Sequence, residues 1–234
     1  MKIKRLVALL AVLLLSIGML SGCDILGQNP TETTEGPLIK DNPFEPTESG
    51  MFIRDNGTAA GAEVTDFAQD YYDIAELKTH VEALVAEYNQ NKAGLNYAYA
   101  EDAPSGKNLP VAISRLSQAD GKVTLILECL TPADYITIND LNLTSNGLKS
   151  LTKYTVAEWK NTGKTLGGEL KDVTGAVVGA DKALGNETYH VVVCDGATCL
   201  QVQGEVKYMS KNVTYVDVDT VKTPAGEVSY IIYR

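Results

Sequence analysis

Residues 74–88 carry apolar side chains at the spacing of one face of an α-helix. These positions are Ile74, Leu77, Val81, Leu84, Val85 and Tyr88. Steps of three and four residues are typical of an amphipathic helix. Asp73 precedes them as a cap for the free backbone N–H groups, and Glu76 can reach back to complete a capping box. Because glycine favours the left-handed conformation in which helices end, we expect one long helix that stops near Gly94.

Two pairs of strand-like segments predict β-hairpins. The first covers residues 51–67 and turns at Asn56-Gly57, the dipeptide most typical of a two-residue hairpin turn. The second runs from Val111 to about Glu128 and turns at Asp120-Gly121. Alternation of side chains in these segments indicates strands, because successive residues of a strand point to opposite faces.

The middle of the chain has shorter patterns. Thr131 followed by Pro132 is typical of a helix start, because the first turn has no use for the N–H that proline lacks. Residues 154–159 fit either a strand or the edge of a helix. Five glycines between residues 163 and 179 divide the region further. The pattern therefore indicates only short elements from residue 141 to residue 184.

Five segments rich in Val, Tyr, Ile and Thr complete the chain. They are residues 189–194, 199–203, 205–210, 213–222 and 228–234. Tight turns separate them, so we expect consecutive strands to pair as an antiparallel β-meander. The elements together predict a mostly antiparallel α+β fold. The long helix would lie on a sheet in residues 51–145 and the meander would form residues 146–234, packed as one domain or as two.

The first 22 residues have the pattern of an export signal. Basic residues at positions 2, 4 and 5 precede an apolar run over residues 6–20, which is shorter than the roughly 20 residues needed to cross a bilayer. The run ends in Leu20-Ser21-Gly22-Cys23, which resembles a bacterial lipobox. That resemblance implies cleavage before Cys23 and attachment of a diacylglyceryl group to it, and two acyl chains anchor a protein stably.

Residues 24–50 have the composition of a disordered tether. They contain four prolines, six acidic residues and few large apolar side chains. Such a segment cannot bury enough surface to offset the entropy of ordering. A flexible chain of this length reaches on the order of 30 Å. We therefore expect residues 23–50 to hold a folded part, residues 51–234, away from the membrane.

The charge of the chain bears on its partners. The net charge is −10, and removal of residues 1–22 leaves 17 basic against 30 acidic residues, a net charge of −13. Phosphate backbones and anionic headgroups repel such a domain. We expect no nucleic-acid partner and a membrane contact made through the lipid on Cys23.

His190, Cys194 and Cys199 form the sharpest candidate site. If Gly196-Ala197 is a two-residue turn, Cys194 faces Cys199 across a hairpin and His190 lies on the same face. Four interpretations stay open: two reduced half-buried thiols, which we favour, a cross-strand disulfide, a metal site, and a catalytic thiol at Cys199. Cys-x4-Cys with one histidine matches zinc sites loosely, so we expect neither a metal nor a cofactor.

Acidic residues gather around the start of the long helix. They are Glu63, Asp66, Asp70, Asp73 and Glu76. Paired carboxylates can perform acid-base chemistry or bind a divalent ion, but acids at a helix N-terminus also complement its dipole, and we favour the second explanation. Residues 217–219 begin like a calcium loop, although Lys222 stands where glycine is required. We expect a strand there, with Val216 and Val218 inward and both aspartates in water.

Aromatic residues offer a further hint. Twelve tyrosines accompany three phenylalanines and one tryptophan. Exposed tyrosines suit contacts with carbohydrate or protein, although tyrosine is also an ordinary strand residue. Tyr97, Tyr99, Tyr154 and Trp159 are the candidates to line a pocket. Cys129 is expected in the core, and His80 on the flank of the helix.

A second resemblance concerns the first hairpin and the helix start. Asp55-Asn56-Gly57, residues 63–67, Tyr72-Asp73 and Glu76-Leu77 are similar to the start of uncharacterised surface lipoproteins from gut Gram-positive bacteria. Those proteins lend no functional residue. The resemblance implies the outer face of a single plasma membrane. In a Gram-negative cell, Asp24 would instead indicate retention on the periplasmic face of the inner membrane.

These observations predict a membrane-anchored extracytoplasmic lipoprotein that is not an enzyme and that presents a surface to a protein or glycan partner. One alternative is a small solute- or glycan-binding module, which requires an apolar, tyrosine-lined pocket with a few converging polar groups. A second alternative is a cell-envelope hydrolase that uses the acidic cluster or Cys199.

Overall fold

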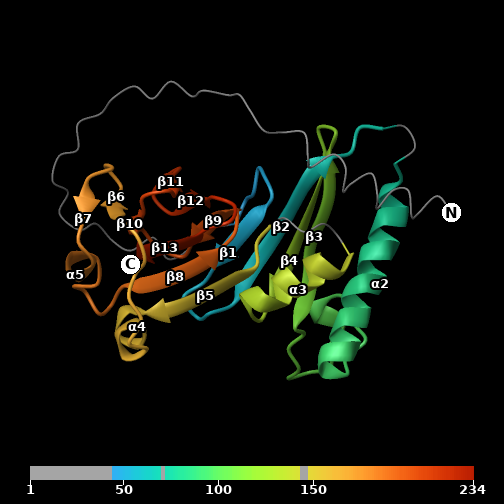
Figure 1. Ribbon diagram of the computed structural model, residues 1–234. Coiled ribbons are helices and arrows are strands. Elements are labelled where there is room, and N and C mark those ends of the chain that lie inside the picture. The colour runs from blue at the N-terminus through green and yellow to red at the C-terminus, as the bar shows by residue number, and fades with distance from the viewer. Residues whose placement is uncertain (1–43, 70–71, 143–146) are drawn as a thin grey trace.

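The computed structural model describes residues 44–69, 72–142 and 147–234. Thirteen strands in these ranges form two sheets, with four α-helices beside them (Figure 1). The predicted α+β class is confirmed. All strand pairs in the described residues are antiparallel except β1 with β9.

Both predicted hairpins are present. The first joins β1 (Gly50–Ile53) to β2 (Ala59–Asp66), and the second joins β3 (Val111–Ala119) to β4 (Lys122–Cys129). Asp120 and Gly121 have positive φ values of 52° and 72°, as the tight turns that suit twisted strands require. Asp120-Gly121 is thus the predicted two-residue turn, whereas five residues, 54–58, connect β1 to β2 in place of a two-residue turn at Asn56-Gly57.

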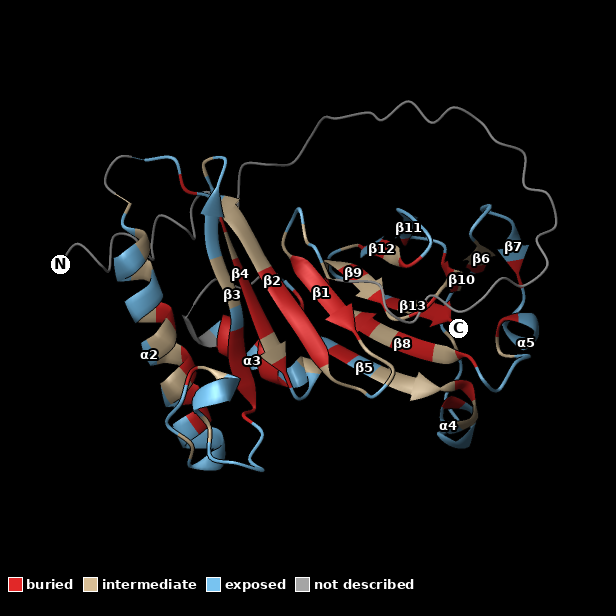
Figure 2. Ribbon diagram, turned by 180° about the vertical axis from the view of Figure 1, so that it is seen from behind, coloured by how far each residue is buried: buried red, intermediate tan, exposed pale blue. Residues whose placement is uncertain are grey.

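The long helix α2 (Ile74–Ala93) is also confirmed. The Asp73 carboxylate accepts hydrogen bonds from the backbone N–H groups of Ala75 and Glu76, at 2.8 and 3.3 Å. Gly94 ends the helix with a φ of 71°. The buried residues lie along one side of α2, which packs beside β3 (Figure 2). Among the described helices, none is long and apolar enough to span a membrane.

The two sheets divide the strands between them. The order of the first is β11-β12-β9-β1-β2-β4-β3, with β9 at Thr198–Val202, β11 at Thr214–Tyr215 and β12 at Thr220–Thr223. The order of the second is β5-β8-β13-β10-β6-β7. Its strands are β5 (Ser150–Thr155), β6 (Leu170–Asp172), β7 (Val177–Val178), β8 (His190–Asp195), β10 (Val206–Ser210) and β13 (Val228–Tyr233). Both halves of the chain contribute strands to the seven-stranded sheet.

Each strand predicted in the C-terminal half corresponds to strand structure, although residues 213–222 form two short strands joined by a turn. Their predicted pairing as a meander is wrong. β8 lies between β5 and β13 in one sheet, whereas β9 lies between β1 and β12 in the other. The chain crosses between the sheets at Gly196, which has a φ of 115°. A Cβ atom there would lie 2.1 Å from the carbonyl oxygen of Gly147. Residues 195–198 are therefore a crossing and not a hairpin turn.

Three short helices complete the fold. They are α3 (Pro132–Asn142), α4 (Val156–Asn161) and α5 (Ala180–Ala183). The Thr131 hydroxyl accepts from the backbone N–H of Asp134 at 3.2 Å, which confirms the predicted helix start. In the ambiguous segment 154–159, the strand ends at Thr155 and α4 follows at once. Thr155 and Glu158 form a capping box there.

One continuous core joins the two sheets and α2 and α3. The inner face of the seven-stranded sheet is covered by the six-stranded sheet at one end and by the two helices at the other (Figure 1). The fully buried residues of this core include Met51, Leu127, Tyr135, Leu200 and Ile231. A second cluster around Trp159 lies between α4, α5 and the opposite face of the six-stranded sheet.

The last residues of the predicted tether contact the sheet. The Phe44 ring stacks on Phe52 of β1 with ring centroids 5.8 Å apart. Glu48 lies 2.7 Å from the Lys222 ammonium group of β12. The chain before residue 44, including the predicted lipobox, lies outside the described residues.

Candidate functional site

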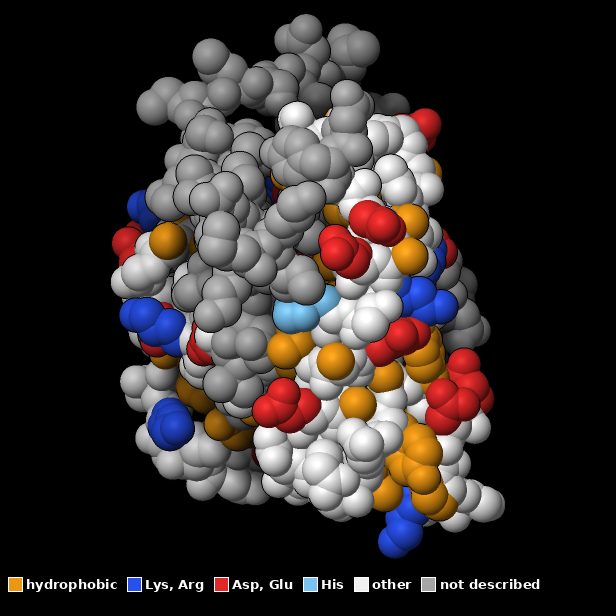
Figure 3. All heavy atoms as spheres, turned by 90° about the vertical axis from the view of Figure 1, so that its right-hand side faces the viewer, with side chains coloured by type: hydrophobic (Ala, Val, Ile, Leu, Met, Phe, Trp, Pro, Cys, Tyr) orange, Lys and Arg blue, Asp and Glu red, His pale blue; other side chains and the backbone are white. Residues whose placement is uncertain are grey.

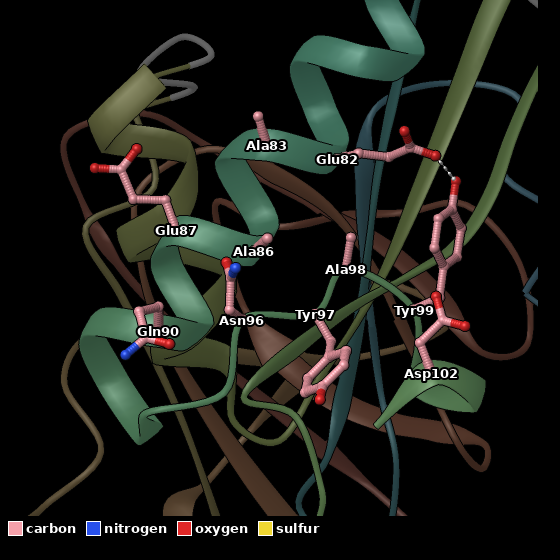
Figure 4. Close-up of a pocket in the computed structure, with 10 residues that line it drawn as sticks. All are labelled: Glu82, Ala83, Ala86, Glu87, Gln90, Asn96, Tyr97, Ala98, Tyr99 and Asp102. Atoms are coloured by element: carbon pink, nitrogen blue, oxygen red, sulfur yellow. Dashed lines mark hydrogen bonds between the residues drawn. The ribbon is translucent and has the colours of Figure 1, made fainter. Parts of the chain in front are cut away.

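An open hollow of about 800 Å³ lies between α2 and the chain that returns toward β3. We call it the Tyr97 hollow. Its lining residues are Glu82, Ala83, Ala86, Glu87, Gln90, Asn96, Tyr97, Ala98, Tyr99 and Asp102 (Figure 4). The first five come from successive turns of α2, and the others come from the segment after Gly94 and from the 3-10 helix η1 (Ala100–Asp102).

A buried asparagine holds the returning segment in place. The Asn89 side-chain amide donates to the carbonyl oxygens of Tyr97 and Val111, at 2.8 and 2.6 Å. Its side-chain oxygen accepts from the Val111 N–H at 3.0 Å. Ala98 adds a backbone bond of 2.8 Å from the Ile113 N–H. Because these bonds join α2, the returning segment and β3, the wall that carries Tyr97 is fixed and not a free loop.

Three alanines line the hollow. Ala86 of α2 lies toward Ala98 of the returning segment, whereas Ala83, one turn earlier on α2, is exposed (Figure 4). Tyr97 remains 36 % exposed, although its backbone is pinned by Asn89. Exposed aromatic faces on a fixed backbone are typical of binding surfaces, because they give large contact area with little loss of side-chain entropy.

Tyr99 forms the polar wall with Glu82. Its hydroxyl donates to Glu82 Oε1 at 2.7 Å. Burial and the neighbouring Glu82 carboxylate raise the pKa of Tyr99 to about 12, so the hydroxyl keeps its proton at neutral pH. The Glu82 carboxylate also lies 3.8 Å from the Lys78 ammonium group, one turn earlier on α2.

The charges of the hollow are negative. Glu82, Glu87 and Asp102 contribute carboxylates, and none of the ten lining residues is lysine or arginine. Figure 3 views the molecule from the side on which α2 lies, where acidic side chains stand among hydrophobic ones. Carboxylates and tyrosines accept hydrogen bonds from hydroxyl and ammonium groups, and an aromatic face attracts a cation. The lining therefore favours hydroxyl-rich or positively charged ligands over anions.

Two of the four predicted pocket residues lie here, and two lie elsewhere. Tyr97 and Tyr99 line the hollow. Trp159 is only 2 % exposed and packs edge-on against Tyr154, with ring centroids 5.5 Å apart, in the cluster beneath α4. Tyr154 and Trp159 therefore pack in this hydrophobic cluster and do not line the hollow.

Cys194 and Cys199 do not face each other as predicted, because β8 and β9 belong to different sheets, whereas His190 and Cys194 share the strand β8. Cys194 is buried, with its Sγ 3.6 Å from the Thr223 hydroxyl, and Cys199 pairs in register with Lys222 of β12. Both thiols are free, as is that of the buried Cys129. Burial raises the pKa of Cys194 and of Cys199 to about 11. The thiols are therefore protonated at neutral pH, and a protonated thiol is a poor nucleophile and metal ligand.

The acidic residues around the helix start do not form one site. Asp73 caps α2, whereas Asp66 and Glu76 are exposed. Glu63 faces α3, where it accepts from the Tyr135 hydroxyl at 2.7 Å and from the Asn139 amide at 3.0 Å. Burial raises the pKa of the Glu63 carboxyl, although these donors lower it.

Asp70 lies outside the described residues. Among the residues that the structure describes, no group of three His, Cys, Asp or Glu side chains is arranged to hold a metal ion. His80 lies on α2, partly exposed.

The prediction for residues 216–219 is also wrong. β11 ends at Tyr215 and β12 begins at Thr220, so the four residues between them form a turn. Val216 and Val218 are 47 % and 36 % exposed, whereas Asp219 is 3 % exposed. Asp219 turns inward because its carboxylate accepts from the Gln201 amide at 2.9 Å and the Thr220 hydroxyl at 2.7 Å.

Apart from Tyr97 and Tyr99, the lining of the hollow and its support were not predicted from the sequence. Glu82, Asp102 and Asn89 carry no motif. Asn89 did carry a signal, because it is a polar residue four positions after Val85 in the apolar stripe of α2. A polar side chain in such a stripe requires buried partners, and here they are the backbone groups of Tyr97 and Val111.

Comparison with known proteins does not assign a family or a function to this site. No protein-family model, no curated protein sequence and no solved structure matches the chain.

Proposed function

We propose that this protein is a lipid-anchored lipoprotein on the outer face of the plasma membrane, and that its folded domain binds a ligand without catalysing a reaction. The lipobox-like Leu20-Ser21-Gly22-Cys23 supports the anchor. The acidic, proline-containing residues that follow support a tether between membrane and domain. The binding site is the Tyr97 hollow.

One observation carries the choice of site. Tyr97 presents an exposed ring in the lining of the hollow, on a backbone segment pinned by Asn89. A concave surface with an aromatic face and a few convergent polar groups is the usual form of a small-ligand site. Tyr97 and the carboxylates of Glu82 and Asp102 fit that description.

The chemistry of the lining narrows the ligand to a small solute or glycan that offers hydroxyl or ammonium groups. The carboxylates of Glu82 and Asp102, which lie on the same side of α2 as Tyr97, accept hydrogen bonds from either group (Figure 4). Sugar rings stack their apolar face on tyrosine while their hydroxyl groups bind nearby polar side chains. An anionic ligand would instead meet repulsion from every charged residue of the hollow.

The alternative of a hydrolase gains no support from the residues on which it would rest. The thiol of Cys199 is protonated, since its pKa is raised to about 11 by burial and the Glu48 carboxylate. The carboxylates of Asp73 and Glu63 have separate partners, the first at the helix cap and the second beneath α3. These positions favour structural roles for both groups.

The binding proposal is tested by saturation-transfer NMR with the full chain in detergent micelles. The probes are soluble N-acetylglucosamine, maltose and cellobiose oligomers, spermidine as a cation, and citrate as an anion. We expect transfer to at least one oligomer or to spermidine, and none to citrate. Transfer to citrate alone, or to no probe, would count against the assigned ligand class.

The anchor is tested by labelling growing cells with a radioactive fatty acid. The wild-type protein should carry the label and sediment with membranes. A Cys23→Ser variant should lose the label and accumulate as the longer precursor. Label that persists in Cys23→Ser would contradict lipidation at this residue without affecting the binding proposal.

A further inference from the structure

The carboxylates of the Tyr97 hollow have unused acceptor oxygens. Glu82 Oε1 accepts from the Tyr99 hydroxyl at 2.7 Å and lies 3.8 Å from the Lys78 ammonium group. In the described part of the chain, Glu82 Oε2 has no hydrogen-bond or ion-pair partner, and neither has the exposed carboxylate of Asp102. Both side chains lie on the same side of α2 as Tyr97 (Figure 4). A molecule in the hollow therefore meets acceptor oxygens that no group of the described chain already occupies.

The negative charge of this wall is poorly balanced. Lys78 faces Glu82, but its side chain is 56 % exposed, and a pair so open to water offsets little charge. Glu101 adds a carboxylate next to Asp102 on η1. Burial and the charges of Glu82, Glu101 and Asp102 together raise the pKa of Tyr99. The three carboxylates therefore act on the same hydroxyl group, and the polar wall of the hollow carries an excess of negative charge.

A neutral ligand and a cation would affect this wall differently. A neutral ligand takes water away from the carboxylates without supplying an opposite charge, and that loss of hydration opposes binding. An ammonium group displaces the same water but forms charge-assisted hydrogen bonds with Glu82 and Asp102. The exposed ring of Tyr97 adds to the preference, because an aromatic face attracts a cation that lies within about 6 Å of its centre.

We infer that the Tyr97 hollow selects an organic ammonium ion, such as a diamine or polyamine, over a neutral glycan. Its ammonium groups bind the carboxylates of Glu82 and Asp102, and its alkyl chain packs on the ring of Tyr97. This inference rests on the proposed binding function and narrows the ligand class to a cation. The ligand must combine an apolar segment with a charged end, because the lining itself combines an aromatic face with carboxylates.

The test compares 1,5-diaminopentane with 1,5-pentanediol, which share one carbon chain and differ in the charge of their ends. Binding of each to the full chain in non-ionic detergent micelles is measured by calorimetry at about pH 7, where carboxylates are ionised and amines are protonated. Maltose and cellobiose oligomers are measured in parallel. We expect the diamine to bind at least about tenfold more tightly than the diol, as one or two hydrogen bonds to charged groups allow.

Two aspartate variants locate the effect. Asp102→Asn removes a carboxylate of the hollow, and Asp181→Asn makes the same change of charge at an exposed position of α5, outside the hollow. The affinity for the diamine should fall about threefold in Asp102→Asn, as for one partly solvated ion pair, and stay at the wild-type value in Asp181→Asn. Raising the salt from about 0.05 to about 0.5 M should weaken binding of the diamine and leave that of the diol unchanged.

The outcomes separate this inference from the proposed function. Equal affinities for diamine and diol, or tighter binding of a neutral oligomer than of the diamine, would overturn the selection of a cation while leaving the hollow as a binding site. Equal losses in Asp102→Asn and Asp181→Asn would also overturn it, because the diamine would then respond to the net charge of the domain. Failure of every probe to bind would count against the proposed function and this inference together.

Discussion

Tyr99 and Glu82 connect the two walls of the Tyr97 hollow through a hydrogen bond of 2.7 Å. Tyr99 belongs to the segment that returns from α2, and Glu82 lies on α2 itself. Removing the hydroxyl in Tyr99→Phe should lower the free energy of unfolding by about 1 kcal/mol, because the acceptor is charged but partly solvated. Urea unfolding of Tyr99→Phe, Glu82→Gln and the double variant measures their coupling. A coupling energy near zero would show that the bond does not hold the walls together.

Asp134 should make the fold sensitive to acid. Its buried carboxylate accepts from the Tyr88 and Thr131 hydroxyl groups at 2.8 and 2.6 Å and lies 3.0 Å from the Lys92 ammonium group. Burial raises the pKa of Asp134, but these donors outweigh it and leave the pKa lowered. The contribution to stability is therefore present above the unfolded pKa of about 3.9 and is lost as the pH falls through the lower folded value.

Asp134→Asn should accordingly cost about 2 to 3 kcal/mol at neutral pH and progressively less below about pH 4. Thermal unfolding across this pH range measures the difference from wild type. Asp181→Asn, an exposed aspartate of α5, is the control and should follow the wild-type curve. A cost for Asp134→Asn that does not change with pH would exclude ionisation as its origin.

Gly61→Ala should be strongly destabilising. A Cβ atom at Gly61 would lie 2.0 Å from the ring of Tyr135, which is 1 % exposed, so the ring must move and its bond to Glu63 must break. We expect a loss of at least about 2 kcal/mol, as for other overpacked cores. Gly179→Ala is the matched control, because no atom lies within 4 Å of its Cβ position and its φ is −72°. Equal stability of both variants would show that β2 and α3 are not packed in this way.

Thiol labelling should separate the cysteines by burial. Cys129 and Cys194 are buried and Cys199 is partly exposed, and all three are free. In the native protein, iodoacetamide should modify Cys199 slowly, because its pKa is about 11 and the thiolate is the reactive form. All three should react after urea unfolding without a reductant. A requirement for reductant at Cys194 and Cys199 would establish a disulfide in place of free thiols.

Local chemistry explains how much of the fold was predictable. Asp73, Gly94 and the Asp120-Gly121 turn act within a few residues of themselves, and the helix and hairpins that they predict are present. The pairing of β9 with β1 joins residues about 150 positions apart. No turn residue encodes such a pairing. The crossing at Gly196 looks like a hairpin turn in sequence, and only its close approach to Gly147 shows otherwise.

The candidate site was predictable to a smaller extent. Tyr97 and Tyr99 could be named because exposed aromatic residues suit binding, but the same criterion also selected Trp159, a buried residue of α4. The composition of a segment does not reveal which of its side chains will be buried by tertiary packing. Glu82 and Asp102 became part of the hollow only because Asn89 draws the returning segment onto α2.

The central claim is that the Tyr97 hollow binds the ligand, and a matched pair of tyrosine variants tests it most directly. Tyr97 and Tyr215 are 36 % and 38 % exposed, and Tyr215 lies on β11, outside the hollow. The dissociation constant of the probe that binds best in the NMR panel is measured by calorimetry for wild type, Tyr97→Ala and Tyr215→Ala. We predict at least about tenfold weaker binding for Tyr97→Ala, equivalent to about 1.4 kcal/mol, and wild-type affinity for Tyr215→Ala. Wild-type affinity in Tyr97→Ala, or an equal loss in both variants, would contradict the account.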